Sequence, residues 1–61
     1  MEDFRIRLVI EPVDHKSLRK RYYSEMCYSV DETRNPYFPM MMVETAADRV
    51  RALLNLYINQ E

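Results

Sequence analysis

Polar and apolar residues alternate along two early stretches of the chain. Between Phe4 and Val13, apolar residues occupy every second position from Phe4 to Ile10, and mostly charged residues lie between them. This period of two predicts a half-buried strand with one face in water, as is typical of an antiparallel sheet. Tyr22 to Val30 alternates in the same way and is rich in aromatic residues, so we expect a second strand that pairs with the first.

The pattern changes in the last third of the chain. Met40 to Glu44 begins with four consecutive apolar residues, which predict a third, well-covered strand. From Thr45 to Asn59 the apolar residues recur every three or four positions, which predicts a helix with Thr45 as its N-cap and Asp48 in a capping-box position. The predicted fold is a single α+β domain covering residues 1–61, with a three-stranded antiparallel sheet and one C-terminal helix packed on one face (β-β-β-α).

A chain of 61 residues is near the lower size limit for folding alone. One helix on a small sheet rarely supplies more than ~3–5 kcal/mol without a disulfide, a metal or a second subunit. The single cysteine, Cys27, excludes an internal disulfide, and the single histidine, His15, has no second soft ligand nearby for a structural zinc. We therefore expect no metal and no cofactor, and we infer a homodimer.

Several classes of function are disfavoured by composition. A net charge of -1 gives no general attraction to nucleic acid or to acidic membranes, and no apolar run is long enough to span a bilayer. The chain contains no glycine, and the phosphate-binding loops and nucleophile elbows of many enzymes require glycine. The acidic start and the single cysteine favour a cytoplasmic protein.

Catalysis is not expected either. His15, Cys27 and the carboxylates show no spacing that would pair a nucleophile with a base. A domain with three strands and one helix barely closes its own core, whereas an active site needs a pocket of a few hundred Å³ with convergent polar groups.

The leading hypothesis is a small interaction protein that docks onto a larger protein as an accessory or inhibitor protein, a class that includes phage-encoded proteins acting on host proteins. The candidate residues for partner or dimer contact are Tyr37, Phe38, Met40, Met42 and Leu56. Two prolines flank the Tyr37-Phe38 pair and lower the entropy cost of presenting it to a partner, and methionine adapts to irregular surfaces. In the alternative interpretation, Phe38 and the methionines belong to the core, and a third hypothesis is a structural subunit of a larger complex.

A nucleic-acid-binding module is the alternative from another class. Basic and aromatic residues lie close together in the candidate set Lys16, Arg19, Lys20, Arg21, Tyr22 and Tyr23. Cations could neutralise phosphates and the tyrosines could stack on bases. Acidic residues follow closely, at Glu25, Asp31 and Glu32, so a solvated connection between strands is the simpler interpretation.

The predicted strand–strand–strand–helix order is similar to that of the small dimeric phage inhibitors of uracil-DNA glycosylase. The similar part is Tyr22-Tyr23 and residues 38–49, where an apolar strand leads into a Thr-Ala-Ala-Asp helix start. Those inhibitors imitate DNA through strong acidity, whereas this chain carries nine basic residues against ten acidic ones. No family membership is assigned from this similarity.

Overall fold

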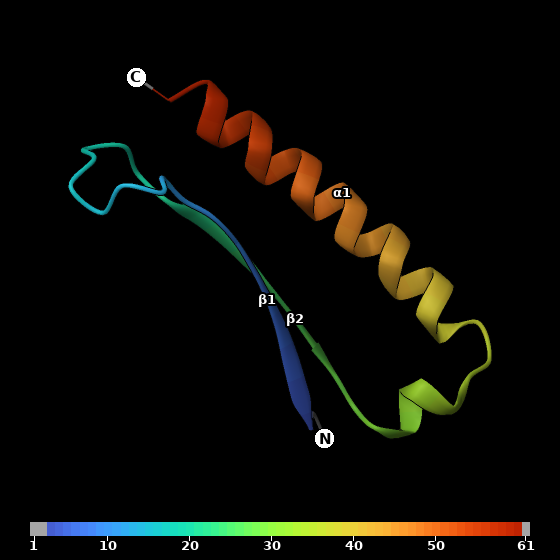
Figure 1. Cartoon of the computed structure of the whole chain (residues 1–61). Helices are drawn as coiled ribbons and strands as arrows, with labels where there is room; N and C mark the ends of the chain where they lie inside the picture. Colours follow the sequence, from blue (N-terminus) through green and yellow to red (C-terminus); the bar gives the residue numbers. More distant parts are fainter. Residues whose placement is uncertain (1–2, 61) are drawn as a thin grey trace.

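A computed structural model describes residues 3–60 and shows two layers, a two-stranded sheet and one long helix (Figure 1). Strand β1 spans Phe4–Ile10, strand β2 spans Tyr22–Tyr28, a short 3-10 helix η1 spans Asp31–Arg34, and helix α1 spans Phe38–Ile58. The strands are antiparallel, and α1 lies along one face of the pair. The expected α+β class with a C-terminal helix is therefore confirmed, in an elongated molecule of 42 × 19 × 16 Å.

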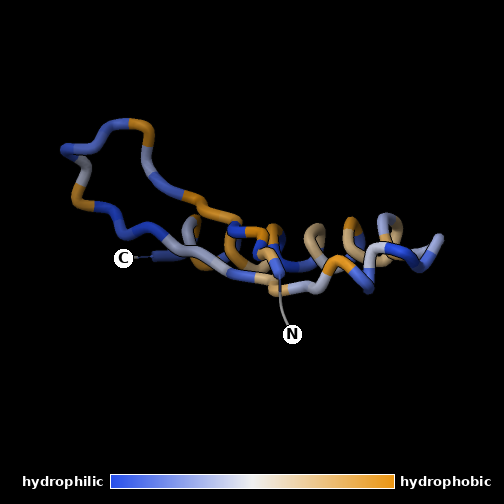
Figure 2. Tube along the Cα trace, turned by 90° about the horizontal axis from the view of Figure 1, so that it is seen from below, coloured by the Kyte–Doolittle hydropathy of each residue, from blue (hydrophilic) through white to orange (hydrophobic). Residues whose placement is uncertain are grey.

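The alternation predicted for both strands is present. Phe4 is opposite Tyr28 and Ile10 is opposite Tyr22, and every second side chain of β1 is half-buried toward the helix. The strands are shorter than predicted, because β1 ends before Pro12, which has no N–H to donate, and Val30 already precedes η1. The hairpin loop between the strands extends beyond their ends and carries both hydrophilic and hydrophobic positions (Figure 2).

The third strand predicted at Met40 to Glu44 is wrong, because these residues form the first turns of α1. A short apolar run fits a buried strand or a buried helix equally well, and methionine is a good helix former. The sheet therefore has two strands among the described residues.

The predicted N-cap at Thr45 is also wrong, since α1 begins two turns earlier. The side chain of Asn35 accepts a hydrogen bond from the Tyr37 N–H at 2.9 Å, and the Asn35 carbonyl accepts one from the Phe38 N–H at 2.9 Å. Pro39 follows in the first turn, where its missing N–H costs no helical hydrogen bond. This turn starts the helix at Phe38.

The core between the layers is thin. Within residues 3–60, Met26 and Leu53 are buried, each 5% exposed, and the other inward side chains are half-buried. At one end Tyr28 lies between two rings: its centroid is 5.9 Å from that of Phe4 and 5.1 Å from that of Phe38, the latter in an edge-to-face contact. A two-stranded sheet is too narrow to cover more than one strip of the helix.

Candidate functional site

The five predicted contact residues fall into two groups. Tyr37, Met40 and Leu56 are exposed, with 66%, 64% and 53% of their surfaces accessible. Phe38 and Met42 are half-buried, and Phe38 packs against Tyr28. The alternative in which Phe38 belongs to the core therefore has direct support, whereas the other three side chains are accessible to a partner.

An exposed apolar stripe runs along one flank of α1. We call it the lateral stripe, and it consists of Met40, Val43, Val50, Leu54 and Ile58. These residues are between 41% and 64% exposed although they recur at helical spacing. Their spacing places Val50, Leu54 and Ile58 on the same apolar stripe as Leu53, but the sheet covers only Leu53 and its inward neighbours.

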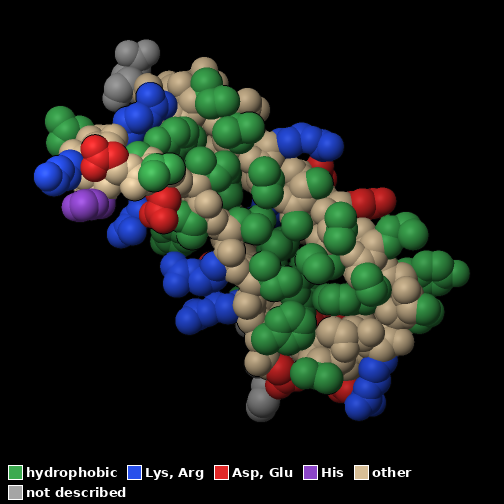
Figure 3. Space-filling view, viewed as in Figure 1, with side chains coloured by type: hydrophobic (Ala, Val, Ile, Leu, Met, Phe, Trp, Pro, Cys, Tyr) green, Lys and Arg blue, Asp and Glu red, His purple; other side chains and the backbone are tan. Residues whose placement is uncertain are grey.

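The two flanks of α1 can be assigned to the two strands. On the flank near β2, the Arg49 Nη1 donates to the Ser24 Oγ at 2.8 Å. Leu56 lies on this same flank, where it lines an open hollow of about 550 Å³ together with Tyr22. The lateral stripe occupies the opposite flank, above β1. Figure 3 shows hydrophobic side chains gathered along the helix on this side of the molecule.

The outer face of the sheet, away from the helix, is charged. Glu25 forms ion pairs with Arg7 at 3.3 Å and with Arg5 at 3.9 Å. The Arg7 guanidinium lies 5.7 Å from the centre of the Tyr23 ring. All of these side chains are exposed or nearly so, and exposed ion pairs contribute little to stability. This face is a solvated surface with Tyr23 as its main apolar feature.

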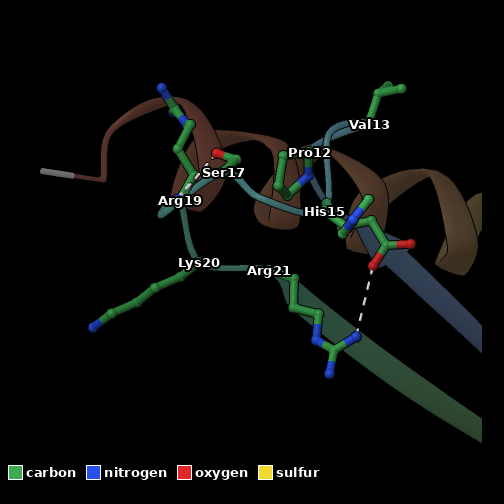
Figure 4. A pocket seen from close by; sticks show the side chains of 8 residues that line it. Pro12, Val13, His15, Ser17, Arg19, Lys20 and Arg21 are labelled. Atoms are coloured by element: carbon green, nitrogen blue, oxygen red, sulfur yellow. Dashed lines mark hydrogen bonds and ion pairs between the residues drawn. The ribbon is translucent and has the colours of Figure 1, made fainter.

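Several residues of the predicted nucleic-acid-binding set instead contact other parts of the chain. Arg19 lies over the Tyr57 ring at 4.6 Å, and its Nη2 donates to the Tyr57 carbonyl at 2.7 Å. Arg21 forms a 3.8 Å ion pair with Glu11, seen in Figure 4. Tyr22 is half-buried against the helix, so Tyr22 and Tyr23 point to opposite faces of β2.

The remaining basic side chains are more accessible. Lys16 is exposed in the hairpin loop, and the Lys20 side chain points away from the open hollow that the loop encloses (Figure 4). This hollow measures about 730 Å³ and is lined by loop residues, including His15 and Arg19. The structure thus brings Arg19, Lys20 and Arg21 close together without making a continuous basic surface of all six residues.

Two contacts that fix the segments following β1 and β2 were not predicted from the sequence. The Ser29 N–H donates to Glu32 at 2.6 Å and the Glu32 N–H donates to the Ser29 hydroxyl at 3.3 Å, which is the reciprocal pairing of a capping box. The Ser-x-x-Glu spacing was visible in the sequence. The contact between the loop and Gln60 was not, because 40 positions separate Gln60 from Lys20.

Residues 3 to 60 contain no cluster of three or more histidine, cysteine or acidic side chains arranged to hold a metal ion. In the same part of the chain, no helix combines the length and the apolar character needed to cross a membrane.

No protein-family model, curated protein or solved structure matches this chain. The similarity to the uracil-DNA glycosylase inhibitors depended on a strand that leads into the helix. Since Met40 to Glu44 is helical, that similarity loses its basis.

Proposed function

We propose that this protein is a small non-enzymatic interaction protein, acting in the cytoplasm as a homodimer that docks onto a larger protein. The observation that carries the proposal is the lateral stripe, which leaves five large apolar side chains of α1 exposed above β1. Scattered apolar residues on a surface need no explanation, but a stripe that follows one helix flank is typical of an interface.

The small core supports the homodimer. Two side chains within the described residues are buried, and a two-stranded hairpin is marginally stable by itself in water. The fully buried side chain of a leucine or methionine contributes about 1.5–3 kcal/mol, so two of them offset little of the entropy lost on ordering the chain. A second copy that covers the lateral stripe would add the missing apolar burial.

The other flank of α1 supports contact with a larger protein. Leu56 is 53% exposed beside a hollow of about 550 Å³. Ala52 and Tyr22 supply apolar walls, while Asn55 and Asn59 supply amide groups at the rim. This hollow fits an apolar side chain of a partner protein. The partner's neighbouring backbone groups can form hydrogen bonds with the side-chain amides of Asn55 and Asn59.

Affinity capture with matched variants tests the docking proposal. Wild-type protein, Leu56→Glu and Leu18→Glu serve as baits, the last being the same substitution at a fully exposed leucine of the hairpin loop. We expect a partner that wild type and Leu18→Glu retain and that Leu56→Glu loses. Equal retention by all three baits would contradict docking at the Leu56 hollow. If the protein is instead a structural subunit of a larger complex, the baits should recover several proteins together in a fixed stoichiometry.

Nucleic-acid binding is the second candidate, favoured by the exposed Tyr23 with Arg7 stacked beside it. A single-stranded oligonucleotide titrated at several salt concentrations tests this alternative, because phosphate contacts make affinity fall steeply with salt. Binding that weakens in Tyr23→Ala and Lys20→Ala would support it. No binding at low salt would remove it.

A further inference from the structure

We propose that two copies of this chain associate side by side through β1 and the lateral stripe. In this arrangement the β1 strands pair antiparallel, giving a four-stranded sheet, and the two α1 helices pack antiparallel on one face of it. The twofold axis passes near Leu8 and between Ala47 and Val50. This inference rests on the homodimer proposed above and specifies its geometry.

The free edge of β1 provides the first argument. β1 pairs with β2 on one side only, and β2 is its sole neighbour among the described residues. The N–H and C=O groups along an open edge can pair with another strand. Because the lateral stripe lies above β1, the same partner can reach both the strand edge and the stripe.

The spacing of strands and helices provides the second argument. Helix α1 contacts both strands, so it lies above the pair. Neighbouring strands are about 4.8 Å apart, and two helices that each cover two strands would therefore lie about 10 Å apart. Packed helices are separated by about 8–10 Å, depending on their side chains. A single placement of the second copy therefore allows both strand pairing and helix packing.

The spacing of apolar residues on α1 provides the third argument. Apolar positions alternate at steps of three and four through the series Met40, Val43, Ala47, Val50, Leu54 and Tyr57. Such a seam favours packing against a second helix. In an antiparallel pair centred between Ala47 and Val50, Val43 lies opposite Leu54 of the second copy, and Ala47 lies opposite Val50 of the second copy.

Charge complementarity supports the antiparallel direction. Glu44 and Arg51 each follow a residue of the lateral stripe and are exposed at its border. The twofold axis brings Glu44 of each copy near Arg51 of the other, which gives two opposite-charge contacts. On the sheet, the axis at Leu8 also places Arg5 opposite Glu11 of the second copy.

A charge exchange tests this geometry. Glu44→Arg and Arg51→Glu each replace two attractive contacts by two repulsive ones, so we expect each variant to dimerise more weakly by on the order of tenfold. Mixing the two variants restores both contacts, so the mixture should form the heterodimer in preference to either homodimer, as measured by native mass spectrometry. Asp48 forms a 3.1 Å ion pair with Arg51, so it cannot serve as the control. Asp31→Arg makes the same charge change in η1, outside both α1 and β1, and should dimerise like wild type.

Hydrogen exchange gives a second readout. Amides of β1 should become more protected as the protein concentration rises, while amides of β2 should show no comparable gain. Circular dichroism checks that each variant keeps its helix.

The failures of the two proposals are distinguishable. A dimer unaffected by both charge substitutions, with no heterodimer preference, would overturn this geometry and leave the homodimer standing. A wild-type protein that stays monomeric from micromolar to millimolar concentration would overturn both, and would assign the lateral stripe to a different partner.

Discussion

The side-chain amide of Gln60 exchanges two hydrogen bonds with the backbone of Lys20. The Lys20 N–H donates to Oε1 at 2.6 Å, and Nε2 donates to the Lys20 carbonyl at 3.0 Å. Nε2 also lies 3.1 Å from the Tyr57 carbonyl at the end of α1. One side chain thus joins the returning arm of the hairpin loop to the end of the helix, 40 positions away in the sequence.

Replacing Gln60 tests this junction. Gln60→Ala removes both bonds to Lys20, and since a hydrogen bond contributes about 0.5–1.5 kcal/mol net, we expect a loss of roughly 1–2 kcal/mol in the free energy of unfolding. Gln60→Glu replaces the donor by a carboxylate oxygen that faces the Lys20 and Tyr57 carbonyls at the negative end of the helix dipole, so it should not restore the lost stability. Urea denaturation measures the loss, and faster hydrogen exchange at the Lys20 amide locates it. An unchanged Lys20 amide would show that the junction does not form in solution.

Arg19 makes a second contact at the same helix end, where a cation also favours the helix dipole. Arg19→Ala should destabilise the protein by about 0.5–1 kcal/mol through loss of the stacking on Tyr57 and of the bond to its carbonyl. Tyr57→Phe keeps the ring and should be close to neutral, whereas Tyr57→Leu loses the stacking but keeps the backbone carbonyl, so it should remove only part of the Arg19 contribution. Lys16→Ala, an exposed loop cation, is the control in thermal denaturation. A Lys16→Ala effect equal to that of Arg19→Ala would mean that general charge, not this contact, is responsible.

The strands were predictable because the period of two is local. Phe4 and Ile10 lie on the inner face as the alternation requires, and the hairpin register follows from pairing two stretches of similar pattern. The start of the helix was not recognised, because Met40 to Val43 carries no periodicity of its own. Asn35 and Pro39 did hold the necessary information, since one bonds the turn before the helix and the other lacks an N–H where none is needed.

The contact residues were harder to predict, because exposure depends on the width of the sheet. A third strand would have covered Leu54 and Val50, and its absence leaves both exposed at the lateral stripe. Met42 was predicted as a contact residue because residues Met40 to Glu44 were expected to form a strand. In the helix its side chain is half-buried, like that of Phe38. For the loop cations, sequence distance hid the decisive fact that Arg19 binds the end of a helix formed much later in the chain.

Adjacent leucines of α1 should respond in opposite ways to truncation. Leu53 is 5% exposed, so Leu53→Ala leaves a cavity in the core and should cost about 2–5 kcal/mol, enough to unfold much of a domain of this size. Leu54 is 43% exposed, so Leu54→Ala should cost little in the isolated subunit and should instead weaken self-association. Urea denaturation at low protein concentration, together with sedimentation equilibrium, separates the two effects.

Met26→Ala serves as the matched core control. Met26 is as buried as Leu53 and lies on the sheet side of the same core, so both truncations should destabilise the subunit. Equal costs for Leu53→Ala and Leu54→Ala at low concentration would contradict the orientation of α1.

The helical state of the methionine run can be tested at Met41, which is 58% exposed and lies outside the lateral stripe. In a helix the order of stability should be Met41→Ala above Met41→Val above Met41→Gly, with glycine about 1 kcal/mol below alanine. In a strand, β-branched valine would exceed alanine. The same three substitutions at Asn55, which is exposed and also lies in the helix predicted from the sequence, provide the reference order. We expect the two positions to agree in thermal denaturation, and a preference for valine at Met41 alone would restore a third strand to the sheet.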